Sequence, residues 1–382
     1  MKRRTLLSIV TLALVGGVWL SLWRLDDGSS SSKRFAGQGA GDIDHPSVQT
    51  PAEAFPSARR NTNLHGSGNL WSAQVRRRGA DEYRPSRNSL IDLHPGDFLE
   101  AWAKVAAGTE TDDLPMAIYA LAERLRVAGN DAVYAELAIT LYDPQATPAA
   151  RERVLTLFGL TATPAAARAL TDYLLSGEPT AELDAVLRDS LLEVAYAPSE
   201  GERRRELGSA FAETWDKLDA SAPVTDAAVI AQALASLGTA EGAQVLLNTL
   251  LGPGRGDAER RGIAAAALGQ LHDDEAVPVL ASALSAPGRD AETTWAAIAG
   301  LVSIDSADAY AALLDGIGRT DALDNRGLGR LQDLLHARVV SDEAARVLRD
   351  ALERRTVPDA RIATLLDDVL AAHDRGQPDE TD

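Results

Sequence analysis

A set of aliphatic residues recurs along the second half of the chain at an almost constant spacing. The first set returns 34 residues later and then another 33 residues later, without gaps: Leu234, Leu237, Leu246 and Leu250; Leu268, Leu271, Leu280 and Leu284; Leu301, Ile304, Leu313 and Ile317. A fourth copy ends in Val339, Leu348 and Leu352. A unit of this length holds two helices, which cannot bury their apolar faces alone. The spacing therefore predicts a stack of helical pairs.

Short segments rich in Gly, Pro and Asp separate the expected helices. The clearest pairs are 226–237 with 240–251, 257–271 with 274–285, 290–303 with 306–317, and 323–338 with 341–354. Three looser pairs precede them, at 112–127 with 130–142, 147–160 with 163–176, and 179–196 with 199–218. A final helix at about 358–373 is expected to form the polar cap that such stacks require.

Capping residues support several of these boundaries. Thr147 and Thr163 each precede a proline, which predicts a side-chain N-cap followed by a first-turn proline. Ser199 and Glu202 have the spacing of a capping box.

Composition favours an all-α fold. Aromatic residues make up only 5% of the chain, and alternating runs of β-branched residues are missing after residue 110. The chain has no cysteine, so disulfides, Cys-ligated metals and thiol nucleophiles are excluded. The six histidines show no metal-ligand spacing. We therefore expect no catalytic residue, no cofactor and no metal site.

The segment from Ala264 to Leu280, AAAALGQLHDDEAVPVL, resembles the HEAT-like repeats of bacterial scaffolds and phycobilin-lyase-type (PBS-lyase-type) proteins. The resemblance is good over about 226–317 and weak elsewhere. It implies an α-solenoid of helical hairpins whose second helices line the concave face, and it implies no activity of its own. A period of 34 also fits tetratricopeptide repeats, but their aromatic positions are Ala or Leu here.

The amino terminus has the pattern of a membrane anchor, which we assign to residues 1–25. Three basic residues, Lys2 to Arg4, precede an uncharged run of 19 residues from Thr5 to Trp23. A helix of that length spans roughly the ~30 Å hydrocarbon core of a bilayer. The alternative, a cleaved signal peptide, normally has a shorter apolar region of about 7–15 residues. Trp19 and Trp23 fit an interfacial belt instead.

The basic residues predict the orientation of this anchor. The contiguous charges before it favour a cytoplasmic amino terminus, so we expect a single pass through the inner (cytoplasmic) membrane and a periplasmic repeat domain at 90–382. Residues 26–89 are expected to be a disordered linker, because 26–70 is rich in Ser, Gly, Pro and Asn. Its second part is an Arg-rich collar, which either binds anionic lipid headgroups or an acidic partner, or else solubilises the linker or folds back on the acidic repeats. The collar arginines are Arg59, Arg60, Arg76, Arg77, Arg78, Arg84 and Arg87.

Acidic residues dominate the repeats and recur in register. Residues 111–382 contain 24 Lys and Arg against 45 Asp and Glu, which disfavours nucleic acid as a partner. Four carboxylates share one position, four residues after a registered aliphatic residue, and we call them the acidic ladder: Glu241, Glu275, Asp308 and Glu343. Stacking is expected to align them along one edge. Either they only offset helix dipoles or they also bind a partner, in which case Asp315 and Asp350 extend the site.

Together these features predict a membrane-tethered scaffold or assembly factor rather than an enzyme. The expected partner is a protein with a basic patch, and no small-molecule substrate is evident. A tethered, substrate-specific chaperone or foldase has the same layout. A lyase-like enzyme with a site on the concave face is a third interpretation, which perturbed carboxylates in a deep apolar pocket would favour.

Overall fold

A computed structural model describes residues 95–107, 114–128, 131–177, 179–218, 222–252, 258–286, 290–318, 324–337, 340–354, 356–357 and 359–376. The predicted anchor at 1–25 and the predicted linker and collar at 26–89 lie outside these residues. Among the helices that the structure describes, none combines the length and the apolar character needed to cross a bilayer.

The described residues form α-helices and one 3-10 turn, η2, and contain no strand, so the predicted all-α class is confirmed for them. The helices are α3 (Pro95–Ala107), α4 (Leu114–Ala128), α5 (Asp131–Tyr142), α6 (Pro148–Thr161), α7 (Pro164–Leu175), α8 (Ala181–Tyr196), α9 (Gly201–Lys217), α10 (Val224–Leu237), α11 (Ala240–Leu251), α12 (Ala258–Leu268), η2 (Asp274–Ala276), α13 (Val277–Ser285), α14 (Ala291–Ile304), α15 (Ala307–Ile317), α16 (Asn325–His336), α17 (Asp342–Glu353) and α18 (Ala360–Gly376).

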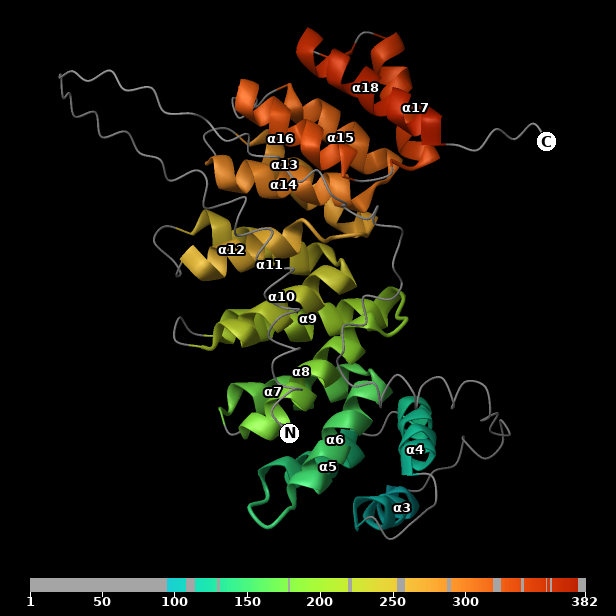
Figure 1. Cartoon of the computed structure of the whole chain (residues 1–382). Coiled ribbons are helices and arrows are strands. Elements are labelled where there is room, and N and C mark those ends of the chain that lie inside the picture. The colour runs from blue at the N-terminus through green and yellow to red at the C-terminus, as the bar shows by residue number, and fades with distance from the viewer. Residues whose placement is uncertain are drawn as a thin grey trace, which may run out of the picture. The chain divides into compact units, whose positions relative to one another are not determined.

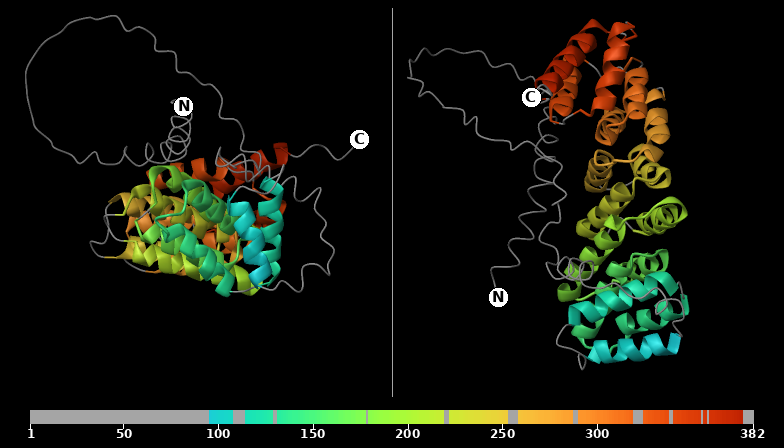
Figure 2. Two further views of the ribbon diagram at one scale, coloured as in Figure 1. Left: turned by 90° about the horizontal axis from the view of Figure 1, so that it is seen from below. Right: turned by 90° about the vertical axis from the view of Figure 1, so that its right-hand side faces the viewer.

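The helices stack in two layers. Each even-numbered helix from α4 to α16 packs against the next even-numbered one, and each odd-numbered helix from α5 to α15 packs against the next odd-numbered one. The pairs follow one another in chain order (Figure 1), and the right-hand view of Figure 2 shows the two layers side by side. Helices of one pair therefore bury their apolar faces mainly against helices of the neighbouring pairs, as expected of a repeat that is not stable alone.

The registered aliphatic positions form the core. All twelve residues of the three gapless copies are buried, from Leu234 to Ile317, and so is Leu348 of the fourth copy. Small residues let the layers approach closely: a Cβ on Gly300 of α14 would lie 2.8 Å from Cδ1 of Leu280 and 2.9 Å from the carbonyl oxygen of Leu268. The predicted register is thus the packing register.

Side-chain caps begin many of the helices. The hydroxyls of Thr147 and Thr163 accept hydrogen bonds from Ala150 N and Ala166 N, which confirms both predicted N-caps. Thr239, Ser306 and Ser341 do the same for α11, α15 and α17. Each of these caps satisfies an amide that has no partner inside its helix.

Two details differ from the sequence prediction. The capping box at Ser199 is wrong: α9 begins at Gly201, whose left-handed backbone (φ 56) separates Ser199 from the helix, and the N-cap, Glu200, makes no side-chain capping bond. The predicted helix at 257–271 ends earlier, at Leu268, because a turn follows at Gly269.

Single helices close the two ends of the described stack. At one end lies α3, which the repeat spacing does not predict; Phe98, Trp102 and Val105 bury one of its faces against α4, α5 and α6. At the other end, α18 packs on α16 and α17 through one apolar face. Its other face carries exposed polar residues, among them Asp367 and Asp368, as expected of a terminal cap.

Candidate functional site

The structure places the four ladder residues at matching points of four consecutive odd-numbered helices. Glu241, Asp308 and Glu343 lie in the first turns of α11, α15 and α17, and Glu275 lies in η2, which leads directly into α13. We call the line of these helix starts the N-terminal edge. A carboxylate in such a position offsets the helix dipole by about 0.3–1 kcal/mol.

Hydrogen bonds between neighbouring pairs join the helix starts along this edge. Ser306, the N-cap of α15, donates its hydroxyl to Asp274 in η2. Ser341, the N-cap of α17, donates its amide to Oδ1 of Asp305 at 3.2 Å and its hydroxyl to the carbonyl oxygen of Asp305 at 3.1 Å. The starts of successive odd-numbered helices therefore lie side by side, and the predicted alignment of the ladder is present.

The ladder residues differ in their partners. Glu275 lies between two arginines of α9: its carboxylate is 4.0 Å from Nη2 of Arg204 and 3.7 Å from Nη2 of Arg205. Glu241 accepts a hydrogen bond from the hydroxyl of Ser209. Asp308 and Glu343 are exposed and have no ion-pair partner among the described residues.

The two predicted extensions of the ladder do not lie at the edge. Asp315 and Asp350 are seven residues after Asp308 and Glu343 on the same helices, which places them about 10 Å further along the helix axes. Asp350 is exposed and forms an ion pair with Arg354 at 2.9 Å. The equivalent positions on α11 and α13 are Asn248 and Ser282, so this second acidic row is confined to α15 and α17.

Cations are scarce in the middle of the stack. Eleven acidic residues stand against two basic ones in the described parts of 222–318, and the two are Arg260 and Arg261. Both hold internal contacts. Arg260 donates to the carbonyl oxygen of Leu218 at 2.6 Å and lies 4.5 Å from the ring centroid of Trp215, while Arg261 binds Glu292 and lies 3.6 Å from Asp290.

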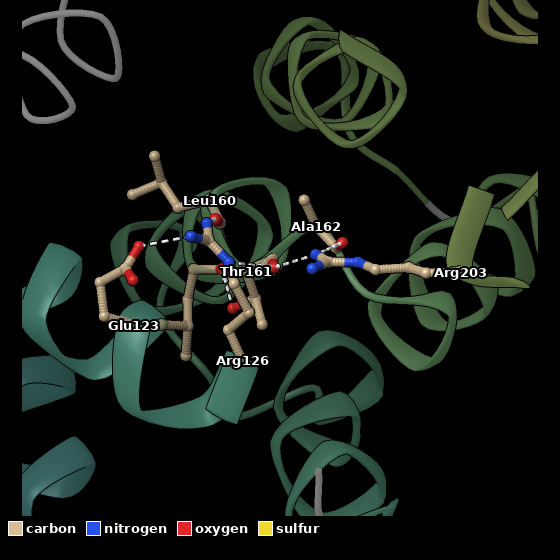
Figure 3. Close-up of polar contacts among 7 residues, drawn as sticks. Glu123, Arg126, Leu160, Thr161, Ala162 and Arg203 are labelled. Atoms are coloured by element: carbon tan, nitrogen blue, oxygen red, sulfur yellow. Dashed lines mark hydrogen bonds and ion pairs between the residues drawn. The ribbon is translucent and has the colours of Figure 1, made fainter. Parts of the chain in front are cut away.

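Arginines elsewhere bind the carboxyl ends of helices, a role that the repeat pattern does not reveal. At the end of α6, Arg126 of α4 donates to the carbonyl oxygens of Leu160 at 2.5 Å and Thr161 at 3.0 Å. Arg203 of α9 approaches the same end and binds the carbonyl oxygen of Ala162 (Figure 3). These guanidinium groups complement the negative helix end. Burial, together with the nearby charge of Arg126, holds the pKa of Arg203 below its usual range.

The sequence pattern also does not indicate a pair of carboxylates on α8. Asp189 and Glu193 lie one turn apart, and burial, with a smaller contribution from the charge of Glu193, raises the pKa of Asp189 to about 6. Among the described residues, no group of three or more His, Asp or Glu side chains has the arrangement of a metal site.

Comparisons with known proteins add little to this geometry. No protein-family model matches the chain, and no curated protein matches it. A solved structure of human deoxyhypusine hydroxylase in complex with glycerol is similar at 20% sequence identity and a TM-score of 0.26, covering 70% of this chain and 96% of that chain. Similarity at this TM-score supports no conclusion about the function or the finer fold of the chain.

Proposed function

We propose that the chain is an α-solenoid scaffold of HEAT-like helical pairs that binds a protein partner through its acidic N-terminal edge. The observation that carries this proposal is the alignment of ladder carboxylates at the starts of α11, η2, α15 and α17. In the described parts of 222–318 both arginines are held by internal contacts. A long acidic edge of this kind favours a partner with a basic patch, through charge complementarity.

The ladder residues contribute unequally in this proposal. Asp308 and Glu343 are exposed and have no cationic partner among the described residues, so their charge is available to a partner. Glu275 is partly neutralised by Arg204 and Arg205. The strongest binding is therefore assigned to the α15 and α17 end of the edge, where Asp308 and Glu343 lie.

The sequence supplies the cellular setting of the proposal. The apolar run at 5–23 and its flanking charges support a tether in the cytoplasmic membrane with the repeats in the periplasm. A partner would then be held within reach of the membrane surface.

Affinity capture with the tagged full-length chain, at low and at high ionic strength, tests the proposal. Two double variants separate the two ends of the edge: Asp308→Asn with Glu343→Gln, and Glu241→Gln with Glu275→Gln. The first is expected to weaken partner capture more than the second and to reduce its salt sensitivity, because exposed charge contacts are screened over about 8–10 Å at ordinary ionic strength.

A matched variant controls for the loss of net charge. Asp172→Asn with Glu182→Gln removes two exposed carboxylates from α7 and α8, away from the N-terminal edge of α11 to α17. Its capture is expected to equal that of the unmodified chain. Equal capture by the first ladder variant and this control, with helical content preserved in both, would reject the edge as the binding site.

A further inference from the structure

An ion pair beside the N-terminal edge joins two helical pairs that are separated by a third pair. Nη1 of Arg204, near the start of α9, lies 2.5 Å from Oδ2 of Asp273, the N-cap of η2. Between them in the chain and in the stack lies the pair α10 and α11, because α11 packs on both α9 and α13. The contact therefore joins the pair α8–α9 directly to the pair α12–α13.

Two glycines leave the space for this contact. Gly238, in the turn between α10 and α11, has a left-handed backbone (φ 62), and a Cβ there would lie 2.7 Å from Cβ of Asp273. Gly208 of α9 faces Thr239 in the same turn, and its Cβ would lie 2.6 Å from the threonine hydroxyl oxygen. Because these two positions carry no side chain, the α10–α11 turn leaves room for the Arg204 side chain to reach Asp273.

A second hydrogen bond holds the Asp273 carboxylate in place, whereas the Arg204 guanidinium leaves two of its donors without a hydrogen bond. The second carboxylate oxygen of Asp273 accepts the amide of Glu275 at 3.0 Å, which fixes the acceptor. The side chains of Arg204 and Asp273 are only 19% and 28% exposed. However, Nε and Nη2 of Arg204 are buried and make no hydrogen bond. Opening the contact returns these two donors to water, which offsets part of what the ion pair contributes.

A second arginine joins the same two pairs, from the start of α12 to the carboxyl end of α9. Arg260 of α12 binds the carbonyl oxygens of Trp215 and Leu218 and lies over the Trp215 ring. Trp215 is eleven residues after Arg204 on α9, about 16 Å along the helix. Both Trp215 and Leu218 are buried, and what Arg260 contacts on α9 are two backbone carbonyl oxygens and an aromatic ring.

We infer that Arg204 and Asp273 form a clasp that holds the N-terminal edge closed across the α10–α11 turn, while the Arg260–Trp215 contact is the pivot about which that edge opens. Opening the clasp spreads the starts of α9 and α13 and leaves their carboxyl ends in place. The clasp lies beside the ladder residue Glu275, so its state sets the spacing of the acidic edge. It depends neither on a partner nor on the proposed function.

The absence of native cysteine lets two introduced labels report this spacing in the full-length chain. Spin labels at Glu206→Cys and Pro278→Cys lie near the starts of α9 and α13, and labels at Asp216→Cys and Ser285→Cys lie near their ends; all four positions are exposed. Arg204→Gln is expected to lengthen and broaden the distance between the labels at 206 and 278, which we call the first distance. The distance between the labels at 216 and 285, the second distance, should stay unchanged. Asp273→Asn should do the same while keeping a side chain that caps helices well.

Arg205→Gln is the matched control. Arg205 is adjacent in sequence, is 69% exposed, and pairs with Glu275 at 3.7 Å rather than with Asp273. It is expected to leave both distances unchanged. High salt should lengthen the first distance in the unmodified chain and not in Arg204→Gln. Three results would overturn the clasp. The distance between the labels at the helix starts could stay unchanged in both Arg204→Gln and Asp273→Asn, or it could change equally in Arg205→Gln. The distance between the labels at the helix ends could also increase along with it.

Discussion

Arg204 and Asp273 belong to helical pairs that are separated by a third pair, yet their charged atoms lie 2.5 Å apart. The hydrogen bond from Arg204, together with its charge and the amide of Glu275, outweighs the effect of burial and holds the pKa of Asp273 below its usual range. The stability of the stack is therefore linked to pH at this contact.

The first prediction concerns that pH dependence. Because the folded-state pKa of Asp273 is lowered, the ion pair stabilises the fold above the ordinary aspartate pKa of about 3.9, and this stabilisation is lost as the pH falls through the lower folded value. Asp273→Asn should reduce the free energy of unfolding at neutral pH, and the difference from the unmodified chain should shrink in acid. Urea unfolding followed by circular dichroism at several pH values measures this. A difference that is independent of pH would contradict the assignment.

Truncating the registered leucines tests the core. Leu268 and Leu280 are fully buried, so replacing either by Ala should lower the free energy of unfolding by about 2–5 kcal/mol. Leu251→Ala is the control, because that side chain is 41% exposed, and its loss should be much smaller. Losses of similar size at Leu251 and Leu280 in denaturant titrations would show that the packing register is wrong.

A pair of glycines tests the closeness of the layers. Gly300→Ala places a methyl group against Leu280 and the carbonyl of Leu268 and should cost about 1–3 kcal/mol of stability. A Cβ on Gly262 of α12 would have no such neighbour within 4 Å, so Gly262→Ala should stabilise the helix by about 0.5–1 kcal/mol. Thermal unfolding of the two variants should therefore shift in opposite directions; a stabilised Gly300→Ala variant would exclude the close contact.

The membrane topology remains a prediction from the sequence. A reporter that is active only outside the cytoplasm, fused after Asp382, should be active if the run at 5–23 spans the membrane with its amino terminus inside. A reporter that works only in the cytoplasm, fused at the same point, is the control and should be silent. The reverse result would overturn the orientation.

Much of the fold was predictable because the core repeats in register. The aliphatic residues from Leu234 to Ile317 recur without gaps, and each copy has to bury the same positions. In contrast, α3 was missed because its buried residues, Phe98, Trp102 and Val105, have no counterpart in that register, and a single helix gives no repeat to detect. The weaker upstream pairs were located instead by their caps, such as Thr147 and Thr163.

The sequence predicts where the ladder carboxylates lie, but it does not predict which of them are neutralised by ion pairs. First-turn carboxylates follow the register, so the alignment of Glu241, Glu275 and Asp308 could be read from the spacing. The partial neutralisation of Glu275 could not be predicted from the spacing. It depends on Arg204 reaching across the α10–α11 turn, where Gly238 has no side chain. This contact forms only where three helical pairs meet, so no sequence pattern within a single pair predicts it.

The carboxyl end of α6 limits how this array can change in length. It receives Arg126 from the preceding pair and Arg203 from the following one. Deleting the pair α6–α7, or inserting another pair beside it, would leave at least one half-buried guanidinium without its carbonyl acceptors. Gain or loss of whole repeats should therefore be tolerated better between α14 and α17, where the bonds from Ser306 and Ser341 join only successive turns, than around α6.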